Sequence, residues 1–119
     1  MNYLTTKEFK EVIADFDDNN KDLKLKIKKN SLVMFTASWC NPCKAVAPVL
    51  EELEREGNFN LYKVDTDEEY ELSKFFNIRS IPTIVFVPIK GQLVSHTGAF
   101  PKSELKKFIT KYFADWEKF

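Results

Sequence analysis

The chain has 119 residues, which is the length of one ordinary domain and too short for two. Its composition is 44% hydrophobic and 14% aromatic, which excludes an intrinsically disordered chain. The 18 basic side chains balance the 18 acidic ones, so no overall field attracts a polyanion such as nucleic acid. We therefore expect a single domain over residues 1–119 that has no nucleic-acid partner.

The first helix is predicted to begin at Thr5, because a threonine followed three residues later by Glu8 offers a capping box. Its apolar positions form one stripe at helical spacing: Phe9, Val12, Ile13 and Phe16. Residues 17–20 should end this helix. In residues 21–30 apolar residues alternate with lysines, and this pattern fits either a short edge strand or an extended connection.

The centre of the chain reads as a buried strand that runs into a helix. Residues 31–37 are almost continuously apolar, as expected of a strand covered on both faces. Apolar residues then recur at helical spacing until Gly57, a plausible helix stop. Pro48 lies inside this helix and should kink it, because proline removes one backbone donor.

The remaining elements alternate between strands and helices. We expect strands at residues 59–64 and 84–87, an acidic turn with a short helix at 65–76, and a hairpin strand at 92–97. A last helix should follow Pro101 with the apolar stripe Leu105, Phe108, Ile109, Tyr112, Phe113 and Trp116. This order predicts an α/β fold whose central mixed sheet of 4–5 strands is flanked by about four helices.

The two cysteines, Cys40 and Cys43, lie between the buried strand and its helix. They enclose so small a loop that a structural disulfide would add little stability through chain entropy. A thiol in the first helical turn lies near unpaired N–H groups and the positive end of the helix dipole, which stabilise its thiolate. The pair therefore predicts dithiol–disulfide exchange, with Cys40 as the accessible attacking thiol and Cys43, one turn deeper, as the resolving thiol.

Three other interpretations of the cysteine pair stay open. It could be half of a metal site, although the sequence has no other cysteine and its one histidine, His96, is the single possible third ligand. It could also be a permanent structural link, or two small core residues. We expect His96 to lie on the solvated surface, and the acidic residues 65–69 to stand at a helix N-terminus rather than in a metal loop.

Three motifs together resemble the thioredoxin family over nearly the whole chain. They are Gly98 before the last helix, Ile81-Pro82-Thr83 before a strand, and Trp39-Cys40-Asn41-Pro42-Cys43-Lys44 followed by Pro48. The resemblance implies a thioredoxin fold and a protein-disulfide reductase that serves electron transport and cell redox homeostasis. It also implies Cys40 as nucleophile, Cys43 as resolving thiol, and no bound cofactor.

The resemblance further implies where substrates bind. In the family, the proline at the position of Pro82 follows a cis peptide bond, and the backbone at Ile81 pairs with an extended substrate segment. Trp39 and Gly98 would shape the groove, and Asn41 and Pro42 would border it beside Cys40. Two alternatives stay open: Trp39 as a plain core tryptophan, and Gly98 as an ordinary turn glycine.

Partners and location follow from the same resemblance. We expect disulfide-containing protein substrates, and a flavin-dependent thioredoxin reductase using NADPH as electron donor. No uncharged stretch is long and apolar enough to span a bilayer, and the N-terminus lacks a basic segment followed by an apolar one. We therefore expect a cytoplasmic monomer with no membrane contact, or an extracytoplasmic protein if a signal peptide has been removed.

The chain departs from the family pattern at three positions. Met34 and Leu61 replace a buried aspartate and its neighbouring lysine, and Asn41 replaces the usual glycine between the cysteines. Loss of both charges together leaves neither one stranded in the core.

Two alternatives to a general protein-disulfide reductase stay open. One is a thiol oxidoreductase outside the cytoplasm that reduces specific partners such as apocytochromes. The other is a binding subunit whose cysteines are dispensable.

Overall fold

A computed structural model of the chain describes residues 2–17 and 23–117. Its main sheet has five strands in the order β1 (Asn2–Tyr3), β5 (Asn60–Asp65), β4 (Ser31–Thr36), β6 (Thr83–Val87) and β7 (Val94–Thr97). β1, β5 and β4 are parallel, whereas β6 and β7 are antiparallel to their neighbours. The helices are α1 (Thr6–Val12), α2 (Asn41–Glu56), α3 (Tyr70–Phe75) and α4 (Lys102–Tyr112). The predicted α/β class with a mixed central sheet is confirmed.

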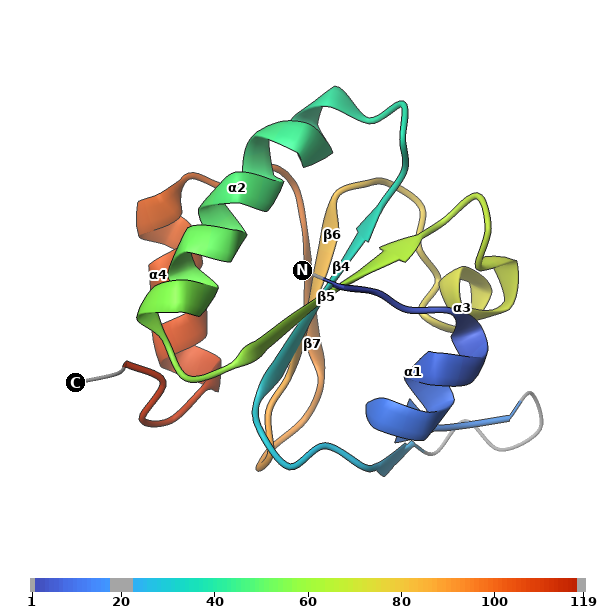
Figure 1. Ribbon diagram of the computed structural model, residues 1–119, viewed down its shortest axis with the longest axis horizontal. Coiled ribbons are helices and arrows are strands. Elements are labelled where there is room, and N and C mark those ends of the chain that lie inside the picture. Colours follow the sequence, from blue (N-terminus) through green and yellow to red (C-terminus); the bar gives the residue numbers. More distant parts are fainter. Residues whose placement is uncertain (1, 18–22, 118–119) are drawn as a thin grey trace.

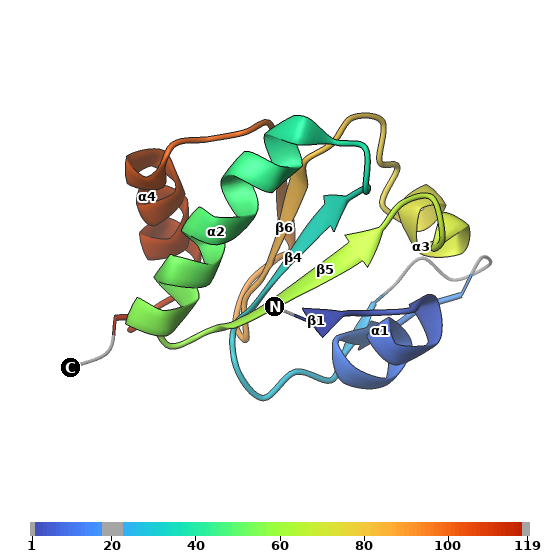
Figure 2. The same cartoon turned by 45° about the horizontal axis from the view of Figure 1, so that its top comes forward.

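The sheet separates two hydrophobic layers, with α2 and α4 on one face and α1 and α3 on the other (Figures 1 and 2). Side chains of a strand alternate between the faces. Leu32 and Met34 of β4 therefore pack in the cluster that includes residues of α2 and α4, and Val33 and Phe35 pack in the other cluster. All six residues of β4 are buried, as predicted for the central strand.

The first helix begins where predicted and ends earlier than predicted. Thr5 caps it with the expected capping box, in which the Glu8 N–H donates to Thr5 Oγ1 at 3.1 Å. The helix ends at Val12, which is exposed, so the predicted single stripe is wrong at that residue. The chain turns instead into β2 (Ala14–Asp15), and this extended exit carries Phe16 back into the core.

β2 pairs with β3 (Lys24–Leu25) in a separate two-stranded sheet. The lysine-rich stretch thus contains a short strand, although that strand does not join the main sheet. Long-range pairing decided this, since the Lys26 N–H donates to the Ile13 carbonyl at 2.8 Å. The predicted helix stop at residues 17–20 lies mostly outside the described residues.

The C-terminal helix also ends before its predicted stripe does. α4 stops at Tyr112, and Trp116 lies beyond it, buried against the start of β5. The Asn58 N–H donates to the Trp116 carbonyl, and a Cβ at Gly57 would lie 2.6 Å from the indole ring. Gly57 therefore allows the Trp116 ring to close this end of the core.

Candidate functional site

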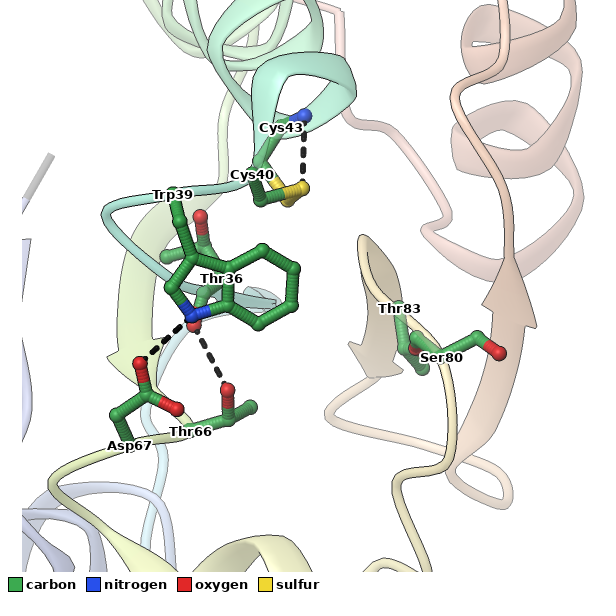
Figure 3. The surroundings of a disulfide bond; sticks show 8 residues. All are labelled: Thr36, Trp39, Cys40, Cys43, Thr66, Asp67, Ser80 and Thr83. Carbon is green, nitrogen blue, oxygen red and sulfur yellow. Dashed lines mark hydrogen bonds between the residues drawn. A yellow bond between two sulfur atoms is a disulfide. The ribbon is translucent and has the colours of Figure 1, made fainter.

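Cys40 stands at the N-cap of α2, after the short turn that follows β4. Its Sγ accepts a hydrogen bond from the Cys43 N–H at 3.2 Å (Figure 3). This confirms the predicted position at the start of the helix, where unpaired N–H groups and the helix dipole favour negative charge. Asn41 and Pro42 occupy the first two helical positions, where proline loses no intrahelical hydrogen bond.

Cys40 and Cys43 form a disulfide with a Cα–Cα distance of 5.3 Å. Cys40 is 3% exposed and Cys43 is 1% exposed. The expected difference in access is therefore small in this oxidised form, because each sulfur shields the other. Asn41 and Pro42 are exposed next to the pair, so the disulfide lies just beneath the protein surface.

Beside the disulfide lies a shallow groove of about 400 Å³. Its lining residues come from the segments that follow β4, β5 and α3. They are Trp39, Thr66, Ile78, Arg79, Ser80 and Ile81. Trp39 is 65% exposed, and its indole N–H donates to Asp67 Oδ2 at 2.8 Å, as Figure 3 shows. The interpretation of Trp39 as a core residue is therefore wrong.

The backbone around Pro82 and Gly98 is joined by a hydrogen bond next to the groove residue Ile81. The Ile81–Pro82 peptide bond is cis. The Gly98 N–H donates to the Pro82 carbonyl at 2.9 Å, and Thr83 Oγ1 donates to the Ser80 carbonyl at 2.6 Å. Gly98 has a φ of +137°, a conformation that glycine adopts at no steric cost. The chain thus brings together Gly98 and Pro82, which lie far apart in the sequence.

The interior behind the cysteines contains no carboxylate among residues 2–17 and 23–117. The buried polar or charged residues of that part of the chain are Ser31, Thr36 and Thr83. Met34 and Leu61 are buried in one core cluster with Val46, which lies one turn after Cys43. Both positions, which carry charges in the family that the sequence resembles, are therefore apolar in this chain. Each side chain packs among other apolar side chains.

His96 is half-buried, so its predicted solvated position is met only in part. Its ring stacks on Phe108 with centroids 4.0 Å apart, and its Nε2 lies 2.8 Å from the Tyr112 hydroxyl. Burial, together with the nearby Lys111, lowers the pKa of His96 below its ordinary value. The signal available in the sequence was the row of aromatic residues on α4, which offers a partner to an inward-facing residue of β7.

Sequence reasoning missed the groove residues Thr66, Ile78, Arg79 and Ser80, and it missed Asp67, which accepts the Trp39 indole N–H. Asp67 and Thr66 follow β5, and Arg79 and Ser80 precede the Ile81–Pro82 motif. For Arg79 and Ser80, their position directly before the Ile81-Pro82-Thr83 motif was the available signal. In the acidic run, Glu69 stands at the N-cap of α3 as expected, but its Oε1 accepts from the Thr6 N–H at 2.7 Å and so ties α3 to α1.

The described part of the chain, residues 2–17 and 23–117, lacks two features. No group of three or more His, Cys, Asp or Glu side chains in it is arranged to hold a metal ion. None of its helices is both long enough and apolar enough to cross a bilayer.

Comparison with known proteins identifies one family. The family model described as Thioredoxin matches residues 1–111. A thioredoxin of Borreliella burgdorferi is 31% identical over 112 residues, covering 92% of this chain and 95% of that protein. An M-type chloroplastic thioredoxin of Spinacia oleracea is 41% identical over 103 residues, which are 84% of this chain but only 57% of that protein.

Solved structures agree with the sequence matches. The chain superposes on chloroplastic thioredoxin z with a TM-score of 0.76 and 25% identity, covering 94% of this chain and 93% of that one. A thioredoxin from Halobacterium salinarum NRC-1 gives a TM-score of 0.73 and 28% identity, covering 93% and 88%.

Proposed function

The chain belongs to the thioredoxin family and is a thiol–disulfide oxidoreductase, and from this premise we propose that it works as a general protein-disulfide reductase. The main support is the position of Cys40, whose sulfur caps α2 while it is bonded to Cys43. A reducing dithiol must expose one stabilised thiolate and hold a second thiol within bonding distance. The Cys40-Asn41-Pro42-Cys43 stretch supplies both thiols.

The proposed reaction begins with the reduced dithiol. The Cys40 thiolate attacks one sulfur of a substrate disulfide, forming a mixed disulfide and releasing the other substrate sulfur as a thiolate, which takes up a proton. The Cys43 thiol then loses its proton and attacks Cys40 Sγ, releasing the second substrate thiol. Two electrons pass to the substrate, and the protein is left with the Cys40–Cys43 disulfide.

Substrate binding is proposed to use the groove beside the disulfide. Trp39 and Ile81 line this groove. The proposed binding surface continues over Pro82 and Gly98, and Asn41 and Pro42 border its entrance at the start of α2. An extended substrate segment would hydrogen-bond to the backbone of Ile81 as an added strand. Because such recognition uses main-chain groups, it tolerates many substrate sequences.

The apolar core near Cys43 leads us to expect a slow second step, in which Cys43 resolves the mixed disulfide. Removal of the Cys43 proton is assisted by a base only when one lies within hydrogen-bond reach, directly or through one water. The neighbouring core positions Met34 and Leu61 carry no ionisable group. We therefore expect the proton to leave through the departing substrate thiolate or water, with slow resolution of the mixed disulfide near neutral pH.

The proposal includes the partners and the setting. A flavin-dependent thioredoxin reductase would return electrons to the Cys40–Cys43 disulfide, since the proposed reaction consumes the dithiol. The remaining parts of the proposal are that residues 1–119 act as one domain, as a monomer and in the cytoplasm. Purification of the natural complex would test the partner, and sedimentation of the pure protein would test the monomer.

Equilibration with glutathione tests the direction of the reaction. A reductase should have a reduction potential below that of the glutathione couple, so that at equilibrium its dithiol passes electrons to oxidised glutathione. A potential above that couple would contradict the reductase role. Trapping of mixed disulfides with Cys43→Ser would then identify substrates, and it separates general reduction from service to a few extracytoplasmic partners.

A further inference from the structure

One basic side chain lines the groove without a charged partner. Arg79 is exposed, and its Nε donates to Asn77 Oδ1 over a long 3.4 Å. Within the described residues, none of the ion pairs includes Arg79. The acid on the opposite side, Asp67, already accepts the Trp39 indole N–H. The groove therefore presents an unpaired positive charge beside the exchange site.

The backbone on both sides of Arg79 is held in place. Asn77 adopts a left-handed conformation with a φ of 54°, and the Ile78 N–H donates to the Ser73 carbonyl at 2.9 Å. On the other side, the Ser80 carbonyl accepts from Thr83 Oγ1 at 2.6 Å. These bonds hold the backbone on both sides of Arg79, so its side chain starts from a fixed place at the groove that Ile81 also lines.

We infer that Arg79 makes the protein prefer disulfides whose cysteine lies near an aspartate or glutamate. This inference rests on the proposed reductase function. Arg79 lies two residues before Ile81, and an extended chain rises about 3.3 Å per residue, so the guanidinium reaches a substrate side chain within about three positions of the reacting cysteine. Its terminal N–H groups donate no hydrogen bond to another described residue, so they can hold a carboxylate in bidentate geometry.

The preference adds no chemical step. The same sulfur–sulfur bond breaks, and the same two electrons pass to the substrate. Attraction between the carboxylate and Arg79 raises the rate at which the Cys40 thiolate meets the disulfide. Exposed charge pairs are weak, so we expect an effect of about two- to fivefold at low ionic strength and less in high salt.

The test measures single-turnover reduction of disulfide peptides by the chemically reduced full chain, with excess reductant removed. The peptides are identical except for Glu or Gln placed two residues before or two residues after the cysteine. The wild-type protein should reduce at least one Glu peptide about two- to fivefold faster than its Gln partner. Arg79→Gln should reduce the two at equal rates, and Arg79→Lys should keep most of the preference because the charge remains.

The chain supplies a matched control. Arg55 is its one other arginine, exposed in the last turn of α2. Arg55→Gln makes the same change in net charge at the far end of the helix and should leave the preference unchanged. Equal rates for all peptides with the wild-type protein, or an undiminished preference in Arg79→Gln, would overturn the role of Arg79 alone. Reduction of none of the peptides would overturn the proposed reductase function as well.

Discussion

The rim of the exchange site and the interior directly behind it differ in chemistry. The rim, formed by Trp39, Asn41, Asp67, Arg79 and Ser80, carries exposed polar groups and charges of both signs. The interior, formed by Met34, Val46, Leu50 and Leu61, is buried hydrocarbon with one thioether. The groups proposed to bind substrate and to stabilise the Cys40 thiolate are therefore separate from any group that would move the proton of Cys43. The rim offers groups for substrate binding and thiolate stabilisation. No described side chain of the interior is assigned to proton transfer from Cys43.

The largest expected effect comes from the sulfur at the rim. Cys40→Ser should abolish turnover in an insulin reduction assay, because a hydroxyl at this position neither ionises near neutral pH nor forms a disulfide. Cys43→Ser is the matched control, which should still attack and then accumulate as a mixed disulfide. Retention of the cellular function by Cys40→Ser would favour a binding subunit whose cysteines are dispensable.

The second effect tests the interior. Met34→Asp should lower the free energy of unfolding by about 3–5 kcal/mol, because an uncompensated charge is buried. If the new carboxylate accepts the Cys43 proton, resolution of the mixed disulfide should become roughly tenfold faster and depend on pH. Met34→Leu, a near-isosteric control, should cost less than about 1.5 kcal/mol and leave the rate unchanged.

Stopped-flow measurement of the second step across about pH 6 to 9 decides between these outcomes. A Met34→Asp rate identical to wild type over the whole range would show that the interior does not limit resolution. The double variant with Leu61→Lys should recover part of the lost stability, since a buried charge costs less when it is paired.

A smaller effect is expected from the hydrogen bond that holds Trp39. Asp67→Ala should lower kcat/KM for protein disulfides about two- to fivefold, because the indole loses the acceptor at 2.8 Å that orients it over the groove. Asp67→Asn keeps an acceptor oxygen at that place and should stay close to wild type. A loss of equal size in the asparagine variant would assign the effect to charge rather than to orientation.

The smallest effect concerns His96, which belongs to neither region. Because its folded pKa lies below the ordinary value of 6.5, the unfolded chain binds this proton at a higher pH than the folded chain. The neutral ring therefore contributes stability that is present above about pH 6.5 and is lost as the pH falls through and below that value. Denaturant unfolding between about pH 5.5 and 8 should show this slope, and His96→Gln should flatten it. An equal slope in the variant would assign it to carboxylates.

Elements with local signals were predicted well from the sequence. The capping box at Thr5 and the helix over residues 41–56 could be found because caps and helical periodicity depend on residues within a few positions of one another. The end of α1 was predicted wrongly, since the pairing of Ala14 with Leu25 overrode the helical pattern at Phe16. Trp116 was predicted on the last helix but lies beyond its end, because its ring packs against Gly57 and Phe59, which are distant in the sequence.

The sequence by itself determined the exchange chemistry, because two cysteines separated by two residues at the start of a helix carry their own reactivity. It also determined that Met34 and Leu61 bring no charge to the core. Only the tertiary structure decided which side chains surround the cysteines, since the turns after β4 and β5 and the turn before β6 meet there through strand pairing. The place of Arg79 in the groove, the orientation of Trp39 and the partial burial of His96 all depend on contacts between residues distant in the chain, which no local pattern encodes.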